Sequence, residues 1–142
     1  MAHVFSIAER EAFLAEVRVA VVAIAARDRG PLAVPVWYAY APGGEIGLWM
    51  DGASAKVREL RREGRLTLCV QDATRPYRYV SVEGPVTGIA PIDVERELRP
   101  LIARYLGADA VEAYLAGFGG ADGVRGDVWV RVAPAHWRAE QL

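Results

Sequence analysis

The sequence predicts an α+β fold in which a six-stranded, mostly antiparallel β-barrel carries short flanking helices. Segments rich in β-branched and aromatic residues recur along the chain and are separated by turns that contain Gly or Pro. Helical patterns occur only near the start, in the middle and late in the sequence, so they do not alternate with strands as in a doubly wound sheet. The 142 residues suffice for one core, which predicts a single domain over 1–142 with a helical insert at about 91–118.

The chain begins with a helix and a strongly apolar strand. Ser6 and Glu9 form a capping-box pattern, which predicts a helix at about 7–16. Residues 18–26 are rich in β-branched side chains and are apolar at both odd and even positions. Because a strand with one solvated face alternates in polarity, this pattern predicts a central strand that is covered on both faces.

Two further strands, at 32–41 and 45–50, lead into a second helix at about 54–63. Pro35 lies within the first of these strands and cannot donate a backbone hydrogen bond, which implies a bulge or an unpaired edge there. Gly64 follows the helix and is typical of a residue that ends one.

The second half of the chain predicts three strands, at 65–71, 77–89 and 127–134. Gly84 and Pro85 indicate a bend in the long middle strand. The insert has apolar residues at helical spacing, with a break at Pro100 and a second helical piece at 110–116. The glycine-rich segment 119–123 predicts a loop.

Composition and charge exclude several classes of protein. The chain is 53% hydrophobic, yet it lacks the run of about 18 apolar residues that a membrane-spanning helix needs. Its net charge of −1 argues against a general nucleic-acid binder. Cys69 is the only cysteine, so we expect a small buried hydrophobe, with neither a disulfide nor a metal cluster. The N-terminus lacks the pattern of a secretory signal, which favours a cytoplasmic protein.

Lys56 is the most informative residue because it is the only lysine among 17 basic side chains. It follows the turn Asp51-Gly52-Ala53 and lies in the first turn of a helix that Ser54 can cap. A helix N-terminus is already electropositive, so an ammonium there is disfavoured unless an anion lies nearby. A bound phosphate fits this pattern, and the alternative is a Lys56 that is solvated or paired with Asp51.

Two motifs resemble landmarks of the pyridoxamine-phosphate-oxidase-like flavoproteins. They are Ser54-Ala55-Lys56, after a strand and turn, and Arg78-Tyr79-Val80-Ser81-Val82-Glu83-Gly84 further on. The resemblance also covers 17–40 and 132–138, and is greatest to the short-chain branch that uses FMN or the deazaflavin coenzyme F420. It implies the FMN-binding split β-barrel, in a homodimer whose protomers share the cofactor site.

The resemblance also implies the residues of that site. Ser54 and Lys56 would hold the cofactor phosphate, with Val36 and Trp37 facing the ring system and Met50 beside it. Arg78 and Tyr79 would reach the cofactor from the other protomer. The seven implied cofactor-binding residues are thus Val36, Trp37, Met50, Ser54, Lys56, Arg78 and Tyr79. The four tryptophans are otherwise expected as core or interface anchors, a role that Trp37 can combine with stacking.

The implied activity is hydride transfer between FMN or F420 and a small conjugated substrate. No catalytic side chain is required, because the coenzyme supplies the chemistry. Ala55 stands where family members that oxidise pyridoxamine phosphate usually carry a second basic residue, which argues against that reaction. The polyglutamate tail of F420 suits an arginine-lined groove, which Arg58, Arg61, Arg62 and Arg78 could form. The alternative function is a flavin- or haem-binding storage or sensor protein without turnover.

Overall fold

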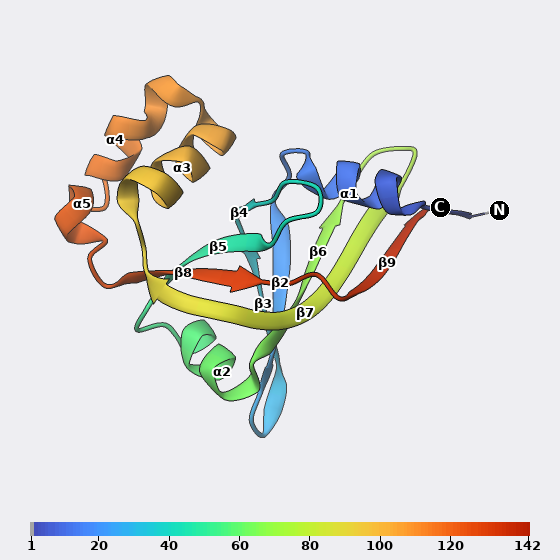
Figure 1. Ribbon diagram of the computed structural model, residues 1–142, viewed down its shortest axis with the longest axis horizontal. Helices are drawn as coiled ribbons and strands as arrows, with labels where there is room; N and C mark the ends of the chain where they lie inside the picture. The colour runs from blue at the N-terminus through green and yellow to red at the C-terminus, as the bar shows by residue number, and fades with distance from the viewer. Residues whose placement is uncertain (1) are drawn as a thin grey trace.

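A computed structural model describes residues 2–142, in which a strongly curled sheet carries α1 at one end and a group of short helices at the other (Figure 1). The strands are β1 (His3–Val4), β2 (Ala20–Ala26), β3 (Arg29–Val36), β4 (Tyr38–Ala39), β5 (Ile46–Asp51), β6 (Arg65–Gln71), β7 (Arg78–Pro91), β8 (Asp127–Val132) and β9 (His136–Gln141). The helices are α1 (Ile7–Ala15), α2 (Ala55–Glu63), the π-helix η1 (Val94–Leu98), α3 (Arg99–Leu106), the 3₁₀ helix η2 (Ala108–Ala110), α4 (Val111–Ala116) and α5 (Gly120–Gly123). None of these helices is long and apolar enough to cross a bilayer.

The two edges of the sheet meet at Trp37. The main path of strands runs β3-β2-β6-β7-β8-β5-β4, so β3 and β4 lie at its opposite edges. Yet β3 ends at Val36 and β4 begins at Tyr38, which leaves a single residue between them. Neighbouring strands lie about 4.8 Å apart, so one residue cannot connect the edges of a flat sheet of this width. The sheet is therefore curled, and all of its strand pairs are antiparallel, which confirms the predicted split β-barrel.

Strand β7 belongs to both halves of the barrel and curves between them (Figure 1). It pairs with β6 as far as Pro85 and with β8 from Val86 onward. At Gly84 an added Cβ would collide with the carbonyl oxygen of Ala133, because the chain leaving β8 passes close to the backbone there. Glycine is required at this crossing, and the predicted bend at 84–85 is confirmed.

The caps of α1 and α2 match the expected helices. Ser6 and Glu9 form the complete capping box of α1, and Ser54 caps α2, which ends at Gly64 with a left-handed φ of 72°. On α1 the apolar face is short, because Phe13 and Leu14 are buried whereas Ile7 stays 64% exposed.

The insert between β7 and β8 forms a small core of its own. Its buried residues are Leu98, Ile102, Val111, Leu115 and Val124, and Trp37 and Trp49 of the barrel pack against them. The break expected at Pro100 corresponds to the change from the π-helix η1 to α3, where this proline occupies the first turn. The predicted loop at 119–123 is wrong in one respect, because its last four residues form the single-turn helix α5.

Within residues 2–142 the structure has nine strands where six were expected, because one expected strand is divided in two and two others were not predicted. The strand expected at 32–41 is interrupted at Trp37, since the backbone N–H of Tyr38 donates to the Tyr105 hydroxyl at 3.1 Å instead of to a neighbouring strand. Strands β1 and β9 were not expected. In β9 only Ala139 is buried, so the segment lacks the alternation that marks a strand, and pairing with β7 holds it in place.

The outer face of β2 is uncovered in this chain, contrary to the expectation of cover on both faces. Ala20, Val22 and Ile24 point into the core, whereas Val21 is 45% exposed. Val21 lies between Pro35 of β3 and Cys69 of β6, so Cys69 is half-buried on this face and not in the core. We call the surface formed by Val19, Val21, Ala23, Ala33, Pro35 and Cys69 the outer face. Pro35 lies in an edge strand of the main path, as expected.

Candidate functional site

A pocket of about 270 Å³ lies beside the point where β3 gives way to β4. It is lined by Val19, Pro35, Val36, Trp37, Trp49, Lys56 and Tyr114. Three of the seven residues predicted for the cofactor, Val36, Trp37 and Lys56, therefore share one pocket. Val19 and Pro35 also belong to the outer face, so the pocket borders that surface.

Lys56 brings an unpaired ammonium group to this pocket. Among residues 2–142 it forms no ion pair, and its side chain is half-buried. Asp51, the alternative partner, instead accepts the backbone N–H of Ala53 at 2.9 Å and so stabilises the turn before α2. The positive charge of Lys56 is thus free to meet an anion from outside the chain.

The start of α2 adds to this positive potential. The Ser54 hydroxyl accepts the backbone N–H of Val57 at 3.4 Å, and no acidic residue lies in the first turn. The turn before α2 lies against the segment that leads into β8, because the N–H of Gly52 donates to the Gly126 carbonyl at 3.1 Å. A Cβ at position 52 would collide with that carbonyl oxygen. Helix dipole and ammonium therefore act on the same side of the pocket.

Trp37 forms part of an aromatic cluster with the insert. Its ring stacks on Tyr105 with centroids 4.8 Å apart and on Tyr114 at 5.3 Å. The Tyr105 hydroxyl also donates to the carbonyl of Arg18 at 2.6 Å, which ties α3 to the residues before β2. The indole is therefore fixed by the insert, and the expected anchoring role of Trp37 is seen together with its place in the pocket wall.

Trp49, and not Met50, faces the pocket from β5. Side chains alternate along a strand, so Met50 points into the barrel core, where it is 2% exposed, and Trp49 points outward. The indole N–H of Trp49 donates to the Asp127 carboxylate at 2.6 Å, which fixes its orientation. Ser54 does not line the pocket and acts through the cap of α2.

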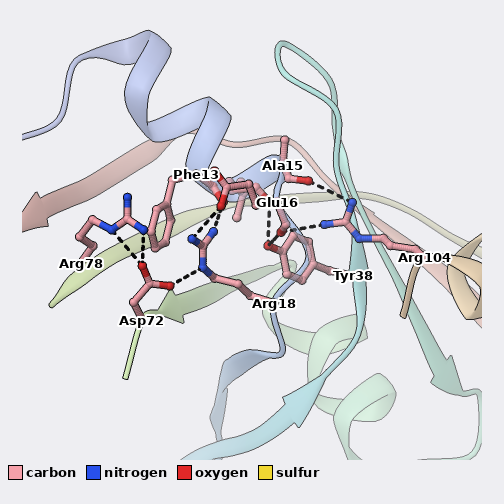
Figure 2. A network of polar contacts seen from close by, with 9 residues as sticks. Phe13, Ala15, Glu16, Arg18, Tyr38, Asp72, Arg78 and Arg104 are labelled. Atoms are coloured by element: carbon pink, nitrogen blue, oxygen red, sulfur yellow. Dashed lines mark hydrogen bonds and ion pairs between the residues drawn. The ribbon is translucent and has the colours of Figure 1, made fainter. Parts of the chain in front are cut away.

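Arg78 and Tyr79 lie away from this pocket in the same chain. Arg78 donates twice to Oδ2 of Asp72, at 2.9 and 2.5 Å, while Arg18 donates to Oδ1 at 2.8 Å (Figure 2). The hydrogen bond from Arg18 is the main cause that lowers the pKa of Asp72. The Tyr79 hydroxyl donates to Glu140 at 2.8 Å on the opposite side of β7. Their contribution to a partner's site stays a prediction.

Sequence reasoning missed four residues of the pocket wall: Val19, Pro35, Trp49 and Tyr114. The alternation of β5 was a usable signal for Trp49, because Met50 and Trp49 cannot face the same side. Tyr114 gave no comparable signal, since its position depends on how the insert packs against the barrel. The pocket has an ammonium group from the first turn of α2 and aromatic walls, a combination suited to an anionic ligand with a planar ring system.

Comparison with known proteins bears on the family and the fold of the chain. A family model described as pyridoxamine 5'-phosphate oxidase matches residues 7–140. No curated protein matches the chain significantly. Among solved structures, the fold is similar to an F420 reductase (22% identity, TM-score 0.70, covering 89% of this chain and 94% of that one). It is also similar to a conserved hypothetical protein from Mycobacterium tuberculosis (26% identity, TM-score 0.77, covering 97% of this chain and 86% of that one). A FAD-binding protein from Mesorhizobium loti is similar as well (18% identity, TM-score 0.71, covering 100% of this chain and 99% of that one).

Proposed function

The chain belongs to the pyridoxamine 5'-phosphate oxidase family, and from this premise we propose that it binds the phosphate of FMN or coenzyme F420 at Lys56. The observation that carries the proposal is the unpaired ammonium of Lys56 in a pocket that Val36 and Trp37 also line. A charged group left without a partner at a helix N-terminus fits a ligand phosphate. The similarity of the fold to an F420 reductase and to a FAD-binding protein supports a coenzyme of this class.

The proposed reaction is hydride transfer to a small conjugated substrate. The bound coenzyme supplies the redox chemistry. Lys56 and the first turn of α2 bind its phosphate, and the aromatic walls at Trp37, Trp49 and Tyr114 orient its ring system and exclude water. No proton-transferring side chain is assigned.

The arginines of α2 favour F420 over FMN. Arg58 and Arg61 are exposed and form no ion pair within residues 2–142. Arg62 instead pairs with Glu59 and donates to a carbonyl oxygen of β2, and Arg78 pairs with Asp72. Of the four arginines expected to bind a polyglutamate tail, we therefore assign Arg58 and Arg61 to it, at positions outside the wall of the Lys56 pocket.

The proposal includes a homodimer that covers the outer face. Val19, Val21 and Pro35 are exposed apolar residues on this face, and Val19 and Pro35 also line the pocket. A symmetric partner seated there would bury the uncovered side of β2 and complete the pocket wall. Sedimentation of Val21→Asp should show dissociation at micromolar concentration, while Ile7→Asp, at an exposed apolar site on α1, should sediment as the wild type. A monomeric wild type contradicts the dimer.

Ligand retention and turnover test the function. The protein is produced in a host that makes both FMN and F420, and the absorption spectrum and mass of the retained ligand identify the coenzyme. Oxidation of reduced F420, or of NAD(P)H with bound FMN, is then followed with quinone-like and enone-like acceptors. We expect retention of F420 and turnover. Binding without turnover of any acceptor would favour the storage or sensor alternative, and failure to bind either coenzyme would refute the assignment.

A further inference from the structure

A second and larger cavity, of about 410 Å³, separates the insert from the β4–β5–β8 side of the barrel. Arg96 and Leu101 line it from the insert, and Trp129 and Arg131 line it from β8. Its volume lies in the range of small-molecule sites. No residue lines both this cavity and the Lys56 pocket, so the two are separate spaces.

The wall at β8 presents an aromatic surface. Val128 and Val130 point into the core, so Trp129 and Arg131 point outward toward the insert. The Trp129 indole lies against the backbone of β5 at Gly47, where any Cβ would collide with its ring. Glycine at 47 therefore lets the indole lie close to the sheet and leaves space above it.

Three guanidinium groups line this cavity without a carboxylate partner. Arg96, Arg104 and Arg131 form no ion pair within residues 2–142. Arg104 is held in place, because its terminal nitrogens donate to the carbonyls of Ala15 and Glu16, each at 3.1 Å (Figure 2). These carbonyls are neutral acceptors, so the charge of Arg104 is not cancelled.

The two carboxylates of the cavity wall are held by other donors. Glu97 accepts the backbone N–H of Asp93 at 2.8 Å, which caps η1, and Glu45 accepts the hydroxyl of Thr87. Neither carboxylate therefore neutralises an arginine directly. Three cations face two carboxylates, and the cavity carries an excess of positive charge beside an aromatic surface.

We propose that this cavity binds a small planar carboxylate, an aromatic acid being the class that fits best. Arg96 and Arg131 are exposed and unpaired, so they can form charge-assisted hydrogen bonds with the carboxylate. The body of the ligand packs against Trp129 and Leu101. This site does not depend on the coenzyme proposed for Lys56.

Benzoate is the probe, titrated by calorimetry into the full chain in the absence of coenzyme. Benzamide, a neutral molecule of nearly the same shape, should bind at least about 10-fold more weakly, because it lacks the charge that the arginines recognise. Arg131→Ala and Arg96→Ala should each weaken benzoate binding by about 10-fold. Arg29→Ala, which removes an exposed arginine at the start of β3, should leave benzoate affinity within about twofold of the wild type. Thermal melting shows whether each variant is folded.

Lys56→Ala separates this site from the coenzyme pocket. Benzoate affinity should be unchanged in this variant even if coenzyme binding is lost. The proposal is overturned if benzoate fails to bind at millimolar concentration, if benzamide binds as well as benzoate, or if Lys56→Ala weakens benzoate binding as much as Arg131→Ala does.

Discussion

Replacing Lys56 with Ala should remove coenzyme affinity without destabilising the fold. The ammonium has no partner within residues 2–142, so its removal leaves no buried charge or hydrogen-bonding group unsatisfied. Alanine also favours a helix slightly more than lysine, and the positive charge at a helix N-terminus disappears. The free energy of unfolding of the protein without coenzyme should therefore stay the same or rise by a few tenths of a kcal/mol.

The loss of affinity follows from the single contact that is removed. A charge-assisted hydrogen bond between an ammonium and a phosphate contributes about 1.5–3 kcal/mol. Because about 1.4 kcal/mol corresponds to a tenfold change in Kd, Lys56→Ala should weaken FMN or F420 binding by about 10- to 100-fold. Lys56→Arg keeps the charge and should retain more of the affinity.

Calorimetric titration of the wild type, the two Lys56 variants and Arg29→Ala measures these differences. Arg29→Ala removes the same charge at an exposed site at the start of β3 and serves as the control for long-range electrostatics. If Lys56→Ala binds coenzyme within about twofold of the wild type, or if Arg29→Ala loses as much affinity, the phosphate assignment is refuted.

Three further predictions concern the fold. The pKa of Asp72 is lowered chiefly by its hydrogen bond from Arg18. The ionised carboxylate therefore stabilises the fold above the unfolded-state pKa near 3.9, and this stabilisation is lost as pH falls through the lower folded-state pKa. The free energy of unfolding of Asp72→Asn should accordingly depend less on pH below about pH 4 than that of the wild type. Tyr38→Phe should lower the free energy of unfolding by about 1–2 kcal/mol, because the buried hydroxyl donates to the Leu14 carbonyl at 2.7 Å, and urea denaturation measures this loss. Gly84→Ala should lower the melting temperature by several degrees, and an unchanged melting curve would contradict the close crossing of chains at this position.

Local patterns in the sequence were enough to predict most of the barrel. The helix bounds followed from side chains that act within a few residues, as Ser6 and Ser54 do in capping α1 and α2. The β7 bend likewise followed from Gly84 and Pro85, residue types that are typical of bends, although the contact that requires glycine at 84 is with the distant backbone of Ala133. Strand β9 was missed because its pairing with β7 depends on backbone hydrogen bonds, which carry no side-chain pattern.

The site was predictable only where a residue's own position defines its role. Lys56 was identified from its place at a helix N-terminus, and Val36 and Trp37 from the resemblance to a family. Tyr114 was not, because the insert lies on the barrel through contacts between residues far apart in sequence, such as its stacking on Trp37. The prediction that both faces of β2 are buried within the chain was wrong for a related reason. An apolar pattern indicates that a strand face is buried, but it does not say whether the same chain or a partner buries it.

The separate core of the insert gives the Lys56 pocket one wall that can open independently. Tyr114 belongs to the cluster around Ile102 and Leu115, whereas Val36 packs against the larger barrel core. Small packed units open by sub-global unfolding at a lower free energy than the whole molecule. Hydrogen exchange should therefore be faster in α3 and α4 than in β6, and a ligand held in the pocket should slow exchange in the insert most. Its dissociation rate would then follow the opening of the insert, with the barrel intact throughout.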